Sequence, residues 1–274
     1  MTVLLPSGET VPALGMGTWM MAEDPGRRSA EIAALRTGLD LGLTLIDTAE
    51  MYGSGASETL VGEAVAGRRD EVFLVSKVLP SHASAAATVR ACEASLRRLG
   101  TDRLDLYLLH WRGAVPLEET LEGFSALLDA GKIRHWGVSN LDLDDMRELT
   151  ALPGRCQTNQ ILYNLTRRGP EHDLLPWHAS TGIPVMAYSP VEQGRLLNSP
   201  ALASVAARHG ATPAQIALAW VLRLPHVNAI PKAGSPDHVR ENARALELRL
   251  SPEDLAELDR AFPPPAGPSP LAVL

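Results

Sequence analysis

Short apolar runs alternate with longer amphipathic segments along most of the chain, and this alternation predicts a repeated strand–helix unit. The runs expected to form strands begin at residues 44, 72, 104, 133, 156, 184 and 226, so successive starts lie 23 to 42 residues apart. Between these runs, apolar residues recur at helical spacing. Repeated units of this size place the strands parallel to one another, with each helix crossing back over the sheet.

The ranges of the expected elements define the fold. Strands are expected at 44–46, 72–76, 104–109, 133–138, 156–160, 184–188 and 226–230, with an eighth near Leu14. Helices are expected at 26–41, 57–66, 89–99, 117–129, 143–150, 172–181, 200–209, 212–222 and 252–261. Eight such units fit an α/β fold of the closed (β/α)8 or TIM-barrel type, in which residues 1–274 form a single domain. This assignment leaves one extra helix before the last strand and one at the C-terminus, and a doubly wound open sheet is the alternative.

The two ends of the chain depart from the repeating pattern. Residues 3–5 and 10–11, separated by the turn Pro6-Ser7-Gly8-Glu9, predict a β-hairpin that covers the closed end of the barrel. Gly15 and Gly17 do not make a dinucleotide fingerprint, because no third glycine and no strand–turn–helix unit follows. The proline-rich segment 262–268 is unable to continue a helix, and we expect it to form a mobile tail.

The composition is that of an ordinary soluble globular protein. The 274 residues are 45% hydrophobic and 21% charged, and the formal charge of -7 argues against a nucleic-acid or anionic-membrane partner. Cys92 and Cys156 lie far apart without metal-ligand spacing, which indicates free thiols in a reducing compartment. No secretion signal and no long apolar run is evident, so the cytoplasm is the expected location.

Polar side chains follow the expected strands at the end where each strand finishes. They are Asp47 and Tyr52, Lys77, His110 and Trp111, Ser139 and Asn140, Gln160, Tyr188 and Ser189, and Lys232. In a parallel barrel the carboxyl ends of all strands meet at one face, where the reactive groups of such folds lie. Singly, such a lysine is usually solvated and such a histidine is usually a packed core residue. Their convergence predicts a functional site.

Four of these side chains form a set suited to proton transfer by a phenol. A free tyrosine has a pKa of about 10, which makes it a weak acid near neutrality. A neighbouring ammonium lowers that pKa, and a carboxylate paired with the ammonium holds it in place. Tyr52, Lys77 and Asp47 supply these groups, and His110 is placed to hydrogen-bond a substrate carbonyl oxygen.

These segments together resemble a known family, the aldo-keto reductases. The matching segments, in order, are Asp47-Thr48-Ala49 with Tyr52-Gly53, Ser76-Lys77, Leu108-Leu109-His110-Trp111, Gly137-Val138-Ser139-Asn140, Tyr188-Ser189-Pro190 and Ile230-Pro231-Lys232. The opening segment, from Leu5 through Trp19, is similar to a bacterial branch that reduces small aldehydes such as methylglyoxal. The resemblance implies a monomeric, metal-free enzyme that reduces an aldehyde or ketone with NADPH, with NADH as the alternative cofactor.

The resemblance also implies a role for each residue. Tyr52 would be the general acid, Lys77 and Asp47 its tuning pair, and His110 the group that orients the carbonyl. Trp19 and Trp111 would wall the substrate pocket, with aromatic core packing as the alternative. The cofactor would contact Gly17, Thr18, Asp47, Ser139, Asn140, Gln160, Tyr188, Ser189, Pro190, Lys232, Ser235, Arg240 and Asn242. Within that set, Tyr188 would stack on the nicotinamide ring, and Ser139, Asn140 and Gln160 would bind its carboxamide.

The segment expected to meet the adenosine half departs from the family pattern. Ser235 and Pro236 predict a helix start, and Lys232 close by makes it a candidate anion site. Many members have an arginine that clamps the 2′-phosphate where this chain has His238. Arg240 is the expected substitute, although a helix places it about 200° around from His238, and a solvated helix face is the alternative. Asn242 would meet the adenine.

Two other classes of function stay open from the sequence. One is a cofactor-sensing barrel that acts through partner proteins, against which the retained Asp47, Tyr52, Lys77 and His110 argue. The other is an isomerase or lyase that binds a sugar phosphate, which would leave Tyr52 unused. Because only a short proline-rich tail follows the helix at 252–261, we expect an open pocket that accepts small or varied aldehydes.

Overall fold

The strands of the protein curl into a closed barrel, as the alternating pattern predicts. The computed structural model describes residues 1–274. The eight parallel strands are β3 (Met16–Gly17), β4 (Leu45–Asp47), β5 (Phe73–Val78), β6 (Leu104–Leu109), β7 (Ile133–Ser139), β8 (Asn159–Leu162), β9 (Val185–Tyr188) and β10 (Val227–Ala229). They pair in sequence order, and parallel bridges join Leu14 to Ala229 and Gly17 to Lys232. These bridges bring the first strand to the last and close the barrel.

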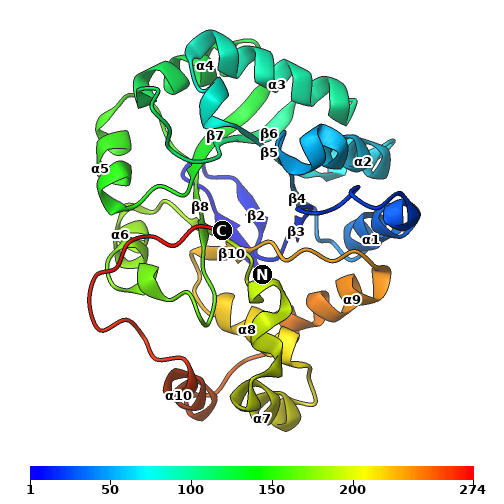
Figure 1. The fold of residues 1–274 in the computed structure, drawn as a ribbon, viewed down its shortest axis with the longest axis vertical. Helices are drawn as coiled ribbons and strands as arrows, with labels where there is room; N and C mark the ends of the chain where they lie inside the picture. Colours follow the sequence, from blue (N-terminus) through cyan, green and yellow to red (C-terminus); the bar gives the residue numbers. More distant parts are fainter.

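A ring of helices surrounds the strands (Figure 1). The helices are α1 (Arg28–Asp40), α2 (Ala56–Val65), α3 (Ala85–Leu99), α4 (Leu117–Asp129), α5 (Leu143–Ala151), α6 (Leu174–Thr181), α7 (Pro200–His209), α8 (Pro213–Val221), α9 (Pro236–Arg244) and α10 (Pro252–Ala261). The predicted extra helices are α7, which together with α8 separates β9 from β10, and α10 at the C-terminus. None of the helices combines the length and hydropathy needed to span a bilayer.

Most of the predicted boundaries agree with the structure to within two residues, and the exceptions are α3, which begins at Ala85 rather than at residue 89, and β8. A strand is predicted at 156–160, but β8 runs from Asn159 to Leu162. Pro184 has no N–H to donate, so the ladder between β8 and β9 begins one residue later, where Asn159 pairs with Val185. Gln160, which was expected to end the strand, therefore lies two residues before the last residue of β8, Leu162.

Burial of the barrel strands on both faces explains their nearly continuous apolar sequences. Every residue of β5 and β6 is buried, including Lys77 and Asp105. In a parallel sheet covered by helices, a strand faces side chains of the barrel interior on one side and helices on the other. One cluster of 68 buried apolar residues runs through both layers, so the two layers share a single core.

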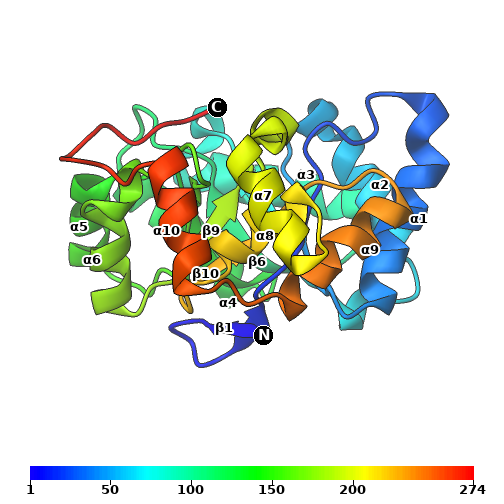
Figure 2. The same ribbon diagram turned by 90° about the horizontal axis from the view of Figure 1, so that it is seen from below.

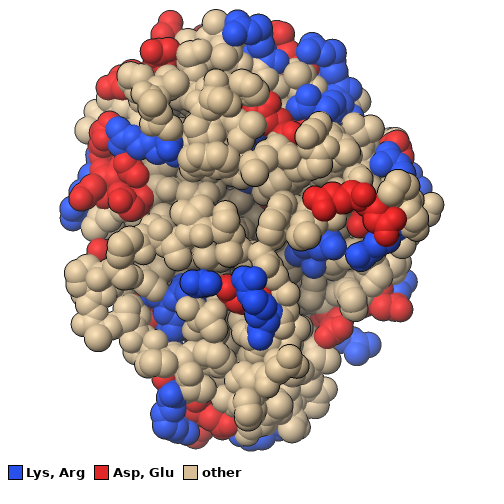
Figure 3. All heavy atoms as spheres, in the orientation of Figure 1, with Lys and Arg blue, Asp and Glu red and all other residues tan.

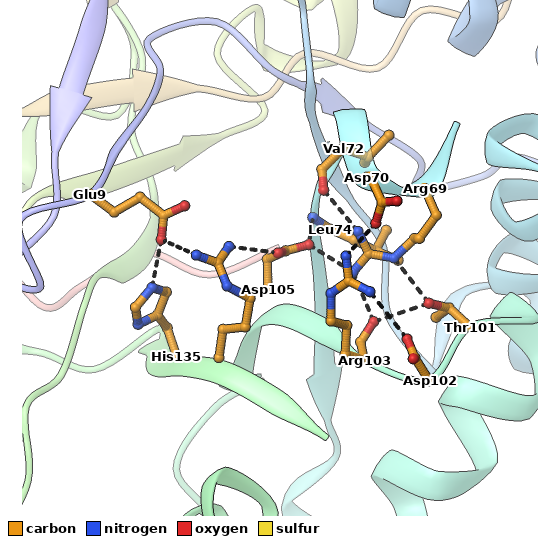
Figure 4. Close-up of polar contacts among 11 residues, drawn as sticks. Glu9, Arg69, Asp70, Val72, Leu74, Thr101, Asp102, Arg103, Asp105 and His135 are labelled. Atoms are coloured by element: carbon orange, nitrogen blue, oxygen red, sulfur yellow. Dashed lines mark hydrogen bonds and ion pairs between the residues drawn. The ribbon is translucent and has the colours of Figure 1, made fainter. Parts of the chain in front are cut away.

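The N-terminal hairpin, β1 (Thr2–Leu4) and β2 (Thr10–Pro12), lies at the end of the barrel opposite to the C-terminus (Figure 2). A chain of ion pairs fastens it there (Figure 4). Glu9, in the hairpin turn, accepts hydrogen bonds from Arg134 at 2.9 Å and His135 at 2.7 Å. Arg134 also donates to the buried Asp105 at 2.8 Å, and Asp105 accepts from Arg69 at 2.7 Å. This network lies at the amino ends of the strands and confirms that the hairpin covers the closed end.

The C-terminal tail follows α10 without forming a further helix, as the prolines predict. It runs back across the open face of the barrel, and the C-terminus lies over its centre (Figure 1). Leu271 packs against the apolar core, and Val273 and Leu274 line the cavity at that face. The proline-rich sequence prevents helix formation but leaves an extended chain free to pack. The open face is therefore partly covered.

Candidate active site

A cavity of about 520 Å3 opens at the carboxyl ends of the barrel strands, where the sequence predicts a site. In the space-filling view of this face, the area around the centre is largely uncharged and most charged side chains lie toward the edge (Figure 3). The predicted residues that line the cavity are Gly17, Trp19, Asp47, Tyr52, His110, Trp111, Ser139, Asn140, Gln160, Tyr188, Ser189, Pro190 and Lys232. Asp47 is the only acidic side chain of its lining, and Lys232 carries its only primary amine.

The turn after β4 brings Tyr52 back over the end of that strand. Tyr52 begins a short 3-10 helix, Tyr52–Gly55, in which Gly53, Ser54 and Gly55 all have positive φ angles of 54°, 52° and 93°. Two of these three positions are glycine, the residue that adopts such angles without steric cost. Consecutive left-handed residues reverse the chain within one turn and direct the phenol into the cavity rather than toward solvent.

Lys77 forms the centre of a hydrogen-bonded set. Its side chain is fully buried, and its Nζ lies 2.8 Å from Oδ2 of Asp47, 2.9 Å from the carbonyl oxygen of Thr48 and 3.1 Å from the hydroxyl of Tyr52. An ammonium has three N–H donors, and each has an acceptor here. The amine is therefore held in one position, with one of its donors aimed at the phenol oxygen.

The pKa of Tyr52 differs from the expectation that a neighbouring ammonium makes this phenol more acidic. Burial raises the pKa of Tyr52, and this effect outweighs the lowering by Lys77, so the net pKa lies above 10.0. Burial also pulls down the pKa of Lys77, but Asp47 and Tyr52 more than offset it and the pKa is raised. At neutral pH the phenol thus keeps its proton and the amine its charge, which is the state that a proton donor needs.

His110 follows β6 and faces the phenol across the cavity. Its ring lies 5.8 Å from that of Tyr52, edge to face. Burial, aided by Lys77, lowers the pKa of His110 from 6.5 to about 3, so the imidazole is neutral. Its Nδ1 is buried without a partner. An orphaned buried N–H is rarer than an under-satisfied acceptor. We therefore assign the proton to Nε2.

The neutral state of His110 has a measurable consequence for stability in acid. The folded-state pKa lies below the unfolded value, so the stabilisation is present above pH 6.5 and is lost as pH falls toward 3. Between pH 7.5 and pH 5, wild type should lose about 2 kcal/mol more unfolding free energy than His110→Gln. Urea unfolding of both proteins at the two pH values measures this difference. Equal losses would mean that the buried imidazole takes up a proton without penalty.

The residues predicted to bind a carboxamide are linked to one another and to Asp47 and His110. Asn140 donates from Nδ2 to the carbonyl oxygen of His110 at 3.1 Å and accepts the hydroxyl of Tyr188 at 2.9 Å. Ser139 donates to the carbonyl oxygen of Gln160 at 2.9 Å. Gln160 donates from Nε2 to Oδ1 of Asp47 at 2.8 Å, a contact that the sequence did not predict. Both oxygens of Asp47 are thereby occupied.

A second group that the sequence did not predict supports the loop after β9. Asn164 donates from Nδ2 to the carbonyl oxygen of Ser189 at 2.9 Å and to Glu192 at 2.7 Å, and Arg167 pairs with Glu192 at 3.0 Å. Within this loop Ser189, Glu192 and Gln193 have positive φ angles. Non-glycine residues adopt such angles only where contacts fix them. No spacing signal in the sequence connects these residues to the cavity.

The remaining predicted residues lie beside or below the cavity rather than in its wall. Thr18 is fully buried and donates to the carbonyl oxygen of Asp47 at 3.0 Å. Ser235 caps α9 by accepting a hydrogen bond from the backbone of His238, as predicted. Arg240 pairs with Asp237 on the exposed side of α9, and Asn242 is half-buried in the same helix. No cluster of three or more His, Cys, Asp or Glu side chains is placed to hold a metal ion.

A model of the aldo/keto reductase family matches residues 13–262. The chain belongs to the aldo/keto reductase family. It is 54% identical over 265 residues to methylglyoxal reductase YeaE of Escherichia coli, covering 94% of this chain and 93% of that protein. An aldo-keto reductase from Mycolicibacterium smegmatis is 36% identical over 266 residues.

Solved structures agree with this assignment. The crystal structure of an aldo/keto reductase from Klebsiella pneumoniae in complex with NADP and acetate has 53% identity and a TM-score of 0.97, covering 100% of this chain and 99% of that one. A structure of an aldo-keto reductase from the same organism in complex with NADPH gives a TM-score of 0.96. This reductase is therefore an oxidoreductase with the (β/α)8 fold, as the sequence predicted.

Proposed function

We propose that this reductase converts aldehydes and ketones to alcohols with NADPH, and that Tyr52 supplies the proton. The observation that carries the proposal is the contact between Lys77 and Tyr52 at 3.1 Å, at the wall of a cavity, with Asp47 on the other side of the amine. The complexes of the Klebsiella relatives with NADP and NADPH support the choice of cofactor. The amides of Asn140 and Gln160 and the ring of Tyr188 supply the hydrogen-bonding and stacking groups that a nicotinamide needs.

In this mechanism the side chains act on the carbonyl oxygen. When bound, NADPH would supply a hydride to the carbonyl carbon and leave as NADP+. Nε2–H of His110 donates a hydrogen bond to the oxygen and orients it. Tyr52 transfers its proton to that oxygen as the C=O π bond breaks, and Lys77 stabilises the phenolate that remains. Because phenolate exists only after proton transfer, this interaction strengthens along the reaction and lowers its barrier.

The cavity favours uncharged substrates of modest size. Trp19, Met51 and Trp111 line it, together with Val273 and Leu274 of the tail. Lys232 is its only primary amine, and we assign that amine to the cofactor. A substrate carboxylate would be desolvated without a counter-ion, which is costly. We therefore propose neutral aldehydes as substrates, with methylglyoxal supported by the 54% identical reductase named for it.

The proposal is tested by an assay that follows the decrease in absorbance of the reduced nicotinamide cofactor. With NADPH, we expect turnover of methylglyoxal and of methyl 4-formylbenzoate. The acid 4-carboxybenzaldehyde should have a kcat/KM at least about tenfold lower than its methyl ester, because an unpaired carboxylate loses more than about 1.4 kcal/mol on desolvation. Absence of turnover with every aldehyde would refute the proposed reaction, and equal kcat/KM for acid and ester would refute the preference for neutral substrates.

We also propose a cytoplasmic location and a monomeric state. Cys92 and Cys156 are both free and buried, which fits a reducing compartment. The formal charge of -7 supports a small-molecule substrate over a nucleic-acid partner.

A further inference from the structure

Two of the seven methionines of the chain are exposed and line the cavity that holds Tyr52. They are Met20 and Met51, with exposed fractions of 51% and 50%. Four others are at most 4% exposed, namely Met16, Met21, Met146 and Met186. The seventh, Met1, is exposed but lies with the hairpin at the opposite end of the barrel (Figure 2). The thioethers that solvent reaches at the site are therefore those of Met20 and Met51.

The turn that carries Met20 fixes its exposure. Met20 has a positive φ angle of 63°, which non-glycine residues adopt only where contacts hold it. The backbone N–H of Met21 donates to the carbonyl oxygen of Thr18 at 3.0 Å, and that of Ala22 donates to the carboxylate of Glu31 at 2.9 Å. Met21 is fully buried as a result, whereas Met20 is left at the mouth of the cavity.

Met51 directly precedes Tyr52, the proposed proton donor. The carbonyl oxygen of Met51 accepts a hydrogen bond from the backbone of Ser54 at 3.1 Å, and the backbone N–H of Tyr52 donates to the carbonyl oxygen of Ala49 at 3.1 Å. One ordered turn thus presents both the thioether and the phenol to the cavity. A chemical change at Met51 alters the surroundings of a bound substrate and leaves the contact of Tyr52 with Lys77 in place.

The thiols of the chain do not compete with these thioethers for an oxidant. Cys92 and Cys156 are both buried, and burial raises the pKa of each thiol to about 12. Oxidants react with the thiolate form of cysteine, which is scarce at neutral pH when the pKa is this high. A thioether has no proton to lose, so its reactivity follows its exposure. Met20 and Met51 are therefore the sites at the cavity that an oxidant attacks first.

We propose that Met20 and Met51 form an oxidation site through which peroxides lower the affinity of this reductase for apolar aldehydes. A lone pair of the sulfur attacks one oxygen of hydrogen peroxide, the O–O bond breaks, and the second oxygen leaves as water after the protons are redistributed. The sulfur is oxidised to a sulfoxide and the peroxide is reduced. The product is polar, so the apolar wall that packs against a substrate is lost.

The modification stands apart from the proposed function, whereas its effect on substrate rests on it. We expect peptide mass mapping of wild type, treated with hydrogen peroxide and then catalase, to find one added oxygen atom on Met20 and one on Met51 before any buried methionine. The KM for methyl 4-formylbenzoate should rise at least about fourfold, the loss of one methylene-sized apolar contact, with kcat changed less than about twofold. Methionine sulfoxide reductases A and B together should restore KM.

A double variant, Met20→Leu with Met51→Leu, separates oxidation at the cavity from oxidation elsewhere. Leucine keeps an apolar side chain of similar volume but has no sulfur. The KM of this variant after peroxide should equal its own KM before treatment, although Met1 is still exposed to the oxidant. Met146→Leu is the matched control, because it removes a buried sulfur from α5. Its KM should respond to peroxide as that of wild type does.

Three results would overturn the assignment. They are oxidation of buried methionines as readily as of Met20 and Met51, conversion of both to sulfoxides without a change in KM, and a peroxide response of the double variant equal to that of wild type. An untreated wild type without turnover would instead overturn the proposed function. In that case the Kd of methyl 4-formylbenzoate, measured by fluorescence of the tryptophans that line the cavity, replaces KM, and equal values before and after oxidation would refute the site.

Discussion

Tyr52→Phe is expected to lower kcat for carbonyl reduction about a thousandfold while binding NADPH nearly as tightly as wild type. The substitution removes the only proton donor that Lys77 contacts, at 3.1 Å, and leaves the ring that lines the cavity. General acid catalysis by a positioned side chain contributes about 100- to 10,000-fold, so a loss in the middle of that range is expected. Single-turnover reduction of methylglyoxal measures the chemical step, and fluorescence titration measures cofactor binding.

His110→Phe serves as the comparison for this variant. His110 orients the carbonyl but transfers no proton in the proposed mechanism, so its loss should raise KM as well as lower kcat. Wild-type turnover in Tyr52→Phe would remove Tyr52 as the acid. A shared collapse of NADPH binding in both variants would point instead to damage of the cofactor site.

Lys77→Met should lower kcat at least about a hundredfold and also destabilise the fold by about 3 kcal/mol. The rate falls because phenolate is no longer stabilised by an ammonium, and burial alone holds the pKa of Tyr52 high. The stability falls because Asp47, which is buried, loses its cationic partner, and uncompensated buried charges are costly. Denaturant unfolding and steady-state kinetics on the same preparation measure both effects.

A double variant separates the two effects of Lys77. In Lys77→Met with Asp47→Asn, no unpaired carboxylate remains, so the unfolding free energy should recover by more than about 1 kcal/mol relative to Lys77→Met alone. Catalysis should not recover, because the phenol still lacks its ammonium. A double variant less stable than Lys77→Met would show that the carboxylate was not the source of the instability.

The local features that the sequence predicted well are those set by short-range physical rules. The helices at 117–129, 200–209 and 252–261 were predicted to the residue, because apolar periodicity and flanking prolines define them. The position of the site followed from a single rule, that the carboxyl ends of parallel strands share one face. That rule alone predicts that Asp47, Tyr52 and Lys77 lie close together.

Features that depend on packing between distant segments could not be predicted from the sequence. The packing of α1 against α9 arises because the two helices are neighbours in a closed ring, and no spacing in the chain indicates it. The contact of Gln160 with Asp47 depends likewise on the barrel interior. The pKa of Tyr52 was predicted from one neighbour, whereas burial, which only the fold determines, has the larger effect.

The closure of the barrel determines when the enzyme becomes competent during synthesis. The backbone N–H of Gly15 donates to the carbonyl oxygen of Ala229, and that of Gly17 to Pro231. Tyr52, Lys77 and His110 leave the ribosome early, but the seam that completes the cavity joins the first strand to one made near the end of translation. Contacts of such long sequence separation form slowly. A nascent chain stalled before residue 229 should therefore be devoid of reductase activity, and its exposed edge strands make it a natural client for chaperones.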